Sequence, residues 1–300
     1  MKKLVKNFNN LITKTILKVQ NKTNNNFQIS NFNKYLIAFI SLLFLYLFYL
    51  SIPALYDKSW VQNNIENRLL KEFKINFSTS SDISYRILPT PHFLLKDTKI
   101  LKKDDEKIGL ISDIKTFKVF INQGNFFNKE KIKIKNIKII DANFSLLRND
   151  FSSLNKFSDK KFSENKIEIN NNNIFFKDSL GETISIIKID KAYLFFDKTQ
   201  LLNLFNLKAE VFNIPFIFDF KNQINSSKNK EISVYAKKLK LNILNKSNIS
   251  GSDMISGINT LSTLKNSIKT KYQFENKEVT FESNNSKINN SKVKYNGKLS

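Results

Sequence analysis

Side chains able to carry catalysis are scarce in this sequence. The chain has no cysteine and a single histidine, His92, which lies between Pro91 and Phe93. Without cysteine, disulfides, thiolate nucleophiles and cysteine-based metal sites are excluded. A catalytic histidine needs a nucleophile or an orienting carboxylate placed by the fold, and nothing in the sequence selects one for His92. We therefore expect no catalytic residues.

Acidic and glycine-containing motifs lead to the same expectation. The run Asp104-Asp105-Glu106 has lysines on both sides, which is typical of a solvated turn. The six glycines form no GxGxxG motif, no P-loop and no nucleophile elbow. The sequence therefore predicts a protein that is not an enzyme and that has no cofactor and no metal.

The longest uncharged stretch is residues 35–55, YLIAFISLLFLYLFYLSIPAL. At about 1.5 Å per residue, a helix of this length crosses the hydrocarbon core of a bilayer. Tyr35 lies at one end, and Tyr56 and Trp60 lie at the other, where aromatic side chains favour the headgroup region. We predict a transmembrane helix over residues 35–56, with Tyr35, Tyr56 and Trp60 at the membrane interfaces.

Basic residues before this helix predict its orientation. Residues 1–34 contain no acid and seven lysines: Lys2, Lys3, Lys6, Lys14, Lys18, Lys22 and Lys34. By the positive-inside rule this segment is cytoplasmic, and the domain of residues 57–300 lies across the membrane. No convincing cleavage site follows the span, so a secretory signal peptide is not expected. We expect a single-pass protein of a bacterial inner membrane whose main domain is periplasmic.

Two further features of the charge distribution concern partners. Residues 4–17 place apolar side chains at helical spacing, which fits either a basic amphipathic helix on an anionic membrane or an unstructured basic tail. The net charge of +23 could indicate nucleic acid. Downstream of residue 34, however, 49 − 7 = 42 basic residues face 26 acidic ones, and nearly all are lysine rather than arginine. We expect no nucleic-acid partner.

The region after the span begins with a predicted helix, Asp57 to Phe73. Ser59 and Gln62 have capping-box spacing, and an apolar stripe follows, made of Trp60, Val61, Ile65, Leu69 and Phe73. From Phe73 to Ser300, short runs alternate apolar and polar residues between Asn, Asp, Ser and Gly, which predicts one mostly antiparallel sheet architecture. Two helical insertions are predicted, at Lys198–Leu207 and around Met254–Ile268.

Pro89 and Pro91 predict a tight reversal between two strands, because each fixes φ and removes a hydrogen-bond donor. The segment around them, Asp82 to Ile100, resembles the N-terminal motif of the AsmA-like family (AsmA/TamB-type inner-membrane-anchored periplasmic proteins). Phe126 to Asp150, followed by Ser153-Leu-Asn155, is similar to that family's strand pair ending in an Arg-Asx turn. Lys166–Asp178 and Ile184–Phe196 resemble its next hairpin.

This resemblance covers roughly residues 35–220, and two departures from the family stand out. The basic extension is longer than expected, and the chain stops at Ser300 within strand-like sequence, which predicts a shortened member or a fragment. The resemblance implies a mainly β fold: a transmembrane helix and a short amphipathic helix, then a curled, mostly antiparallel sheet forming a trough open along one side.

The same resemblance implies a function in phospholipid traffic. The trough would hold acyl chains between the inner and outer membranes and contribute to outer-membrane biogenesis. Candidate groove residues are the apolar members of the alternating runs: Ile132, Ile134, Phe144, Leu146, Ile167, Ile169, Ile214, Phe216, Phe218, Phe220, Val234 and Leu241. From the residues alone, an ordinary closed sandwich core explains the same pattern. The alternative function is an envelope scaffold or assembly factor for outer-membrane proteins that carries no lipid. Partners are therefore phospholipid, the inner membrane and, under the alternative, other envelope proteins.

Overall fold

The computed structural model describes residues 10, 13–14, 30–73, 76–78, 82–103, 108–148, 160–224, 229–250, 254–289 and 291–300. The chain divides into two compact units, Met1–Ser51 and Ile52–Ser300. The predicted amphipathic segment 4–17 lies outside the described residues, apart from Asn10, Thr13 and Lys14. These three residues are helical.

The first unit contains helix α2 (Asn31–Ser51), whose side chains are exposed almost throughout. Together with the following 3₁₀ turn η1 (Ile52–Leu55), the helical stretch is 25 residues long and apolar enough to span a membrane. Helix α2 ends before Pro53, which has no N–H to continue the α-helical ladder. The Ser51 hydroxyl instead donates to the Phe48 carbonyl at 2.7 Å.

The second unit opens with the predicted amphipathic helix, α3 (Lys58–Phe73). Val61, Ile65 and Leu69 are buried along one stripe, as the spacing indicates. The predicted capping box at Ser59 is wrong. The helix is capped two residues earlier by Asp57, whose Oδ1 accepts from the Trp60 N–H at 2.8 Å.

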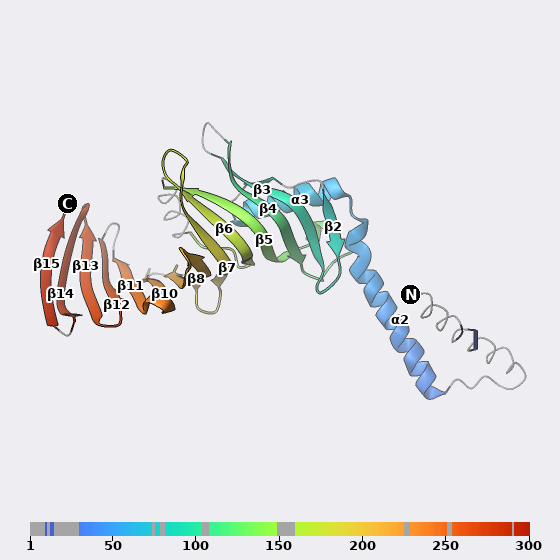
Figure 1. Ribbon diagram of the computed structural model, residues 1–300. Helices are drawn as coiled ribbons and strands as arrows, with labels where there is room; N and C mark the ends of the chain where they lie inside the picture. Colours follow the sequence, from blue (N-terminus) through green and yellow to red (C-terminus); the bar gives the residue numbers. More distant parts are fainter. Residues whose placement is uncertain are drawn as a thin grey trace, which may run out of the picture. The chain divides into compact units, whose positions relative to one another are not determined.

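The rest of the described part of the second unit forms one sheet of fifteen strands that is not closed into a barrel (Figure 1). Successive strands are neighbours from β3 onward, while β1 and β2 both pair with β3. All pairs are antiparallel except β5–β6, so the mostly antiparallel prediction is confirmed. The strands are β1 (Asn76–Ser78), β2 (Ile83–Arg86), β3 (His92–Lys103), β4 (Ile108–Ile121), β5 (Ile134–Leu147), β6 (Lys166–Lys177), β7 (Thr183–Asp197), β8 (Leu202–Val211), β9 (Ile214–Gln223), β10 (Asn229–Ala236), β11 (Leu241–Ser250), β12 (Met254–Ser262), β13 (Asn266–Glu275), β14 (Glu278–Ile288) and β15 (Ser291–Leu299).

The two helical insertions are wrong. Residues 198–201 form a turn in which Asp197 Oδ1 accepts from the N–H groups of Thr199 and Gln200 at 2.7 and 3.2 Å, and β8 follows at once. Residues 254–268 form β12 and the start of β13. In both places the chain pairs with strands on both sides, and this pairing overrides weak helical spacing.

The sheet bends along a row that crosses its first strands. Asp97 in β3, Asp141 in β5 and Asn171 in β6 all have positive φ, between 53° and 57°. The register places Asp97 and Asp141 on either side of Lys115 in β4. Each of these left-handed residues shifts the in–out alternation by one residue without changing the register between the strands, which bends the strand there. Asn171 Nδ2 also donates to Asp141 Oδ1 at 2.5 Å, which links two of these left-handed positions.

Candidate functional site

One unbroken row of apolar side chains crosses eleven successive strands. Strand register makes each member the partner of the next, and alternation places all of them on one side of the sheet, called here the apolar face. From β3 to β13 the row is Leu95, Phe117, Ile139, Ile169, Ala192, Leu207, Phe218, Val234, Ile243, Leu261 and Ile268. The opposite side is called the polar face.

The first part of the apolar face is sealed by helix α3. Leu95 and Phe117 are fully buried, and Val61 and Ile65 of α3 line a cavity of only about 20 Å³ together with Phe93 and Val119 of the sheet. A cavity of this size holds about one water molecule at most. Over β3–β5, therefore, the sheet and α3 form two layers with no room for a ligand.

The described end of the crossover that joins the parallel strands β5 and β6 covers part of the middle of the apolar face. Phe162, in the described end of this crossover, is buried against Phe196 and Phe220. Buried Asn203 of β8 holds the crossover there: its Oδ1 accepts from the Phe162 N–H at 2.9 Å, and its Nδ2 donates to the Lys160 carbonyl at 2.7 Å.

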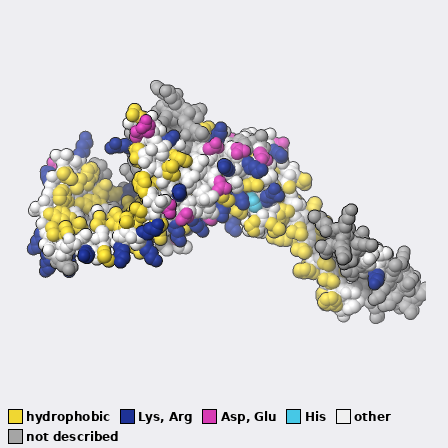
Figure 2. Space-filling view, in the orientation of Figure 1, with side chains coloured by type: hydrophobic (Ala, Val, Ile, Leu, Met, Phe, Trp, Pro, Cys, Tyr) yellow, Lys and Arg dark blue, Asp and Glu magenta, His cyan; other side chains and the backbone are white. Residues whose placement is uncertain are grey.

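Beyond β9 the apolar face is only half-buried. Val234, Ile243, Leu261 and Ile268 of the apolar row all retain partial exposure. A second apolar row, Ile249, Ile255, Phe274 and Val279, lies on the same face of β11–β14 and is also half-buried. It is six residues from the first row along β11, β12 and β13, and the polar residues Asn245, Asn259 and Thr270 lie between the two rows. Figure 2 shows hydrophobic side chains gathered on the visible face over β10–β15, with lysines at its margin. This part of the face is accessible to a ligand.

Two glycines shape this accessible part. Gly257 is the register partner of Tyr272, and Gly297 is the partner of Phe281. A Cβ at Gly257 would lie 2.6 Å from Tyr272 Oη, so only glycine leaves room for this ring to lie across the neighbouring strand. Tyr272 Oη donates to Asn245 Oδ1 at 3.1 Å, which fixes the ring. Flat aromatic rings therefore cover the glycine backbone, as in other sheets where aromatic residues protect glycine.

A hollow of about 1180 Å³ crosses β9–β15. Most of its lining residues lie on the polar face, and Gly257, Tyr272, Phe281 and Gly297 also line it. Its lining includes charged side chains joined by ion pairs. Glu231 lies 3.2 Å from Lys221 and 3.3 Å from Lys246, and Lys271 lies 3.8 Å from Glu282. Burial alone would raise the pKa of Glu231, but hydrogen bonds from both lysines outweigh it and lower that pKa. The hollow therefore combines ion-paired side chains with aromatic ones.

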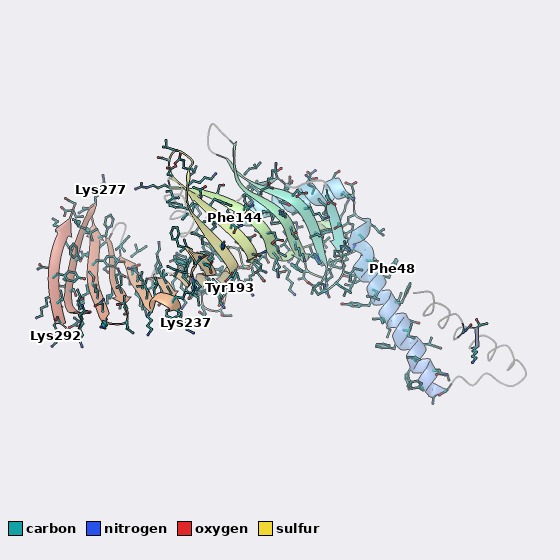
Figure 3. All side chains as sticks on the ribbon, viewed as in Figure 1. Phe48, Phe144, Tyr193, Lys237, Lys277 and Lys292 are labelled. Carbon is teal, nitrogen blue, oxygen red and sulfur yellow. The ribbon has the colours of Figure 1, made fainter. Side chains whose placement is uncertain are left out.

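The structure brings the predicted groove residues to the apolar face, but not to one open site. Ile132 and Ile134 are buried under α3 and line the small cavity there. Phe205 and Phe218 pack on each other with ring centroids 5.7 Å apart, within the cluster around the crossover. Half-buried Val234 and Leu241 lie in the accessible part. The others are half-buried or buried on β5, β6 and β9: Phe144 (labelled in Figure 3), Leu146, Ile167, Ile169, Ile214, Phe216 and Phe220. None of the twelve lines the hollow across β9–β15.

The other singled-out residues have structural contacts. His92 is buried, its Nδ1 lies 2.8 Å from the Thr90 carbonyl oxygen, and its ring lies against Phe120. Burial lowers the pKa of His92. Pro89 and Pro91 form the β2–β3 turn, and the Pro91 carbonyl accepts from the Ile121 N–H at 3.1 Å. Asp104-Asp105-Glu106 lies outside the described residues, and within the described ones no group of three His, Asp or Glu residues is placed to hold a metal.

The sequence-based list of groove residues omitted several apolar residues of the accessible part of the face. Ile255, Phe274, Val279 and Phe281 alternate with polar residues just as the twelve candidates do. Part of this alternation was not recognised, because residues 254–268 were predicted to form a helix. Alternation on its own also does not say which strands the crossover and α3 will cover. No protein-family model matches this chain, and no curated protein matches it.

Proposed function

We propose that this protein is anchored in a bacterial inner membrane by α2, with its sheet domain in the periplasm, and that the accessible part of the apolar face shelters phospholipid acyl chains. In this role it contributes to phospholipid transport between the inner and outer membranes and to outer-membrane biogenesis. The main observation in support is that the apolar row continues beyond α3 and the crossover, onto strands where its residues are only half-buried.

Physical chemistry supports acyl chains as the ligand. An extended apolar face needs a second layer, a membrane or a ligand to cover it. Along the two apolar rows the side chains are aliphatic or aromatic and their register partners are apolar, so these rows provide burial rather than specific hydrogen bonds. An acyl chain is a long apolar ligand that gains most from such a surface.

The continuity of the sheet supports movement of the ligand along it. Fourteen strands follow one another in the hydrogen-bonded path. Stacked at about 4.8 Å, they extend roughly 60 Å. The ligand would enter the uncovered face beyond the crossover, since α3 and Phe162 occupy the preceding part.

Two neighbouring positions on β13 provide a sharp test. Phe274 lies on the apolar face, and Gln273 lies next to it on the polar face. We expect a photo-crosslinking amino acid at position 274 of the full chain, in living bacteria, to form adducts with phospholipid, and the same group at position 273 to form few. Equal phospholipid adducts at the two positions, or none at 274, would refute the proposal.

The alternative, an envelope scaffold or assembly factor, is favoured by a different observation. Strand β15 pairs only with β14 among the described strands, so its other edge offers N–H and C=O groups to an added strand. Under this alternative, photo-crosslinkers at Lys294 or Asn296 of β15 would capture protein partners while position 274 would capture no lipid.

A further inference from the structure

Three large apolar side chains are exposed at one corner of the second unit. Leu55 of η1 is 82% exposed, Leu88 of the β2–β3 turn 78%, and Phe127 of the β4–β5 loop 79%. They belong to three segments that are distant in sequence. We call the surface formed by these three residues the seating surface.

Hydrogen bonds hold the three segments next to one another. The Tyr56 hydroxyl donates to the Phe126 carbonyl, which joins η1 to the β4–β5 loop. The Ile121 N–H donates to the Pro91 carbonyl at 3.1 Å, which joins that loop to the β2–β3 turn. In addition, η1 packs beside β2. The three exposed side chains therefore come from one corner of the domain rather than from scattered turns.

Aromatic and basic residues surround the seating surface. Tyr56 and Trp60 are in edge-to-face contact, with ring centroids 5.8 Å apart, and Lys129 Nζ lies 5.1 Å from the centre of the Trp60 ring. Five basic residues of residues 52–60, 86–91 and 122–133 exceed the two acidic ones: Lys58, Arg86, Lys129, Lys131 and Lys133 against Asp57 and Glu130. Exposed apolar tips, interfacial aromatics and excess positive charge are the combination that binds an anionic bilayer surface.

We infer that the seating surface inserts into the headgroup region of the bilayer that holds α2, so that the domain rests on this bilayer. This inference rests on the membrane-spanning role proposed for α2. Connectivity selects the occupant: Leu55 is the fourth residue after Ser51, the last residue of α2, so the chain between them reaches at most about 14 Å. A bilayer crossed by α2 is therefore always within reach of Leu55.

The cysteine-free chain allows a direct test with single cysteines in the full protein, reconstituted in vesicles of phosphatidylethanolamine and phosphatidylglycerol. Leu88→Cys and Phe127→Cys are labelled with an environment-sensitive fluorophore. The matched controls are Leu180→Cys and Phe212→Cys, which are 85% and 75% exposed. They lie in turns at the opposite ends of the strands from Leu88 and Phe127. We expect labels at 88 and 127 to be at least about threefold less accessible to aqueous iodide than labels at 180 and 212, and to be quenched by spin-labelled lipid.

A second measurement uses the single tryptophan, Trp60, without any label. Replacing Leu88 and Phe127 together by serine should increase quenching of Trp60 by acrylamide, whereas the control pair Leu180→Ser and Phe212→Ser should not. Both pairs are exposed in turns, so the sheet should keep its circular dichroism. A label at Leu43→Cys within α2 separates the possible failures. Lipid quenching at 43 with water-exposed labels at 88 and 127 overturns the inference alone, and a water-exposed label at 43 overturns the anchor and the inference together.

Discussion

At the scale of single residues, the sheet owes its bend to side chains that tolerate a left-handed backbone. Asp97, Asp141 and Asn171 all have positive φ within strands, where most L-residues lose about 1–2 kcal/mol. Aspartate and asparagine are the non-glycine residues that adopt this conformation most readily. Their position in one row across neighbouring strands makes the bend a property of the sheet rather than of one strand.

Asp97 provides a clean test of this explanation, because its side chain is exposed. Asp97→Val should destabilise the domain by about 1–2 kcal/mol, since a β-branched residue is strained at φ 53°. Asp97→Gly should cost little or nothing. The measurement is the urea midpoint of the full chain in detergent. Equal midpoints for the valine and glycine variants would contradict a positive-φ requirement at this position.

Glu168 of β6 links three strands on the polar face and predicts a pH dependence. Its Oε1 lies 3.3 Å from Lys138 of β5 and 3.8 Å from Lys191 of β7. Burial raises its pKa, but hydrogen bonds from Asn170 and Lys138 outweigh this and lower the pKa below the ordinary 4.5. The folded state therefore gains stability from Glu168 above pH 4.5, and this gain is lost as the pH falls through the lowered value.

Replacement of Glu168 by glutamine should remove this contribution. At pH 7 we expect Glu168→Gln to lower the free energy of unfolding by about 1 kcal/mol, with a smaller difference from the native chain below pH 4. Urea unfolding at several pH values measures it. Glu182→Gln, in the exposed β6–β7 turn, is the control and should change stability little at any pH. A loss for Glu168→Gln that is the same at pH 3 and pH 7 would exclude the ion-pair explanation.

At the scale of elements, periodicity correctly predicted the helix and the strands whose form depends on the local sequence pattern alone. The spacing of Val61, Ile65 and Leu69 predicted α3 correctly, and strand alternation predicted the sheet. The helix predicted at Lys198–Leu207 failed because Asp197 closes a turn and β8 pairs with two neighbours. Such pairing involves residues far apart in sequence, and so a local pattern cannot reveal it.

The parallel β5–β6 pair has a consequence that the sequence did not predict. Parallel neighbours need a crossover connection, which has to pass over one face of the sheet. Here its described end lies on the apolar face, where Phe162 fills part of the surface that alternation assigned to a groove. The crossover thus decides which of the twelve candidate residues stay accessible.

Asn203 is the side chain on which this crossover depends. Asn203→Ala leaves the Phe162 N–H and the Lys160 carbonyl without their partner, which should cost about 1–3 kcal/mol. Protease cleavage near residue 162 should accelerate, and the urea midpoint should fall. Asn242→Ala, exposed on β11, is the matched control. Unchanged cleavage in Asn203→Ala would show that the crossover is held by the phenylalanine cluster rather than by Asn203.

At the scale of the whole domain, one apolar row passes from a sealed layer to an accessible surface. Phe117 is fully buried in this row, whereas Ile243 and Leu261 are half-exposed further along it. The alternation of the sequence predicted the row, because the period of a strand is local. The change in burial along it could not be predicted, because it depends on where α3 and the crossover lie.

This change in burial predicts opposite outcomes for the same kind of substitution at two places. Phe117→Asn puts an amide into a packed core without a partner and should cost at least about 3 kcal/mol, or prevent folding. Phe274→Asn replaces a side chain that is only partly buried, so the loss should be about 1 kcal/mol. Urea unfolding followed by circular dichroism compares the two.

The Phe274→Asn chain should remain folded while a photo-crosslinker at Ile255, on the adjacent strand, captures less phospholipid than in the native background. If Phe274→Asn unfolds the domain as Phe117→Asn does, the face beyond β9 is a sealed core, and acyl chains have no place on it.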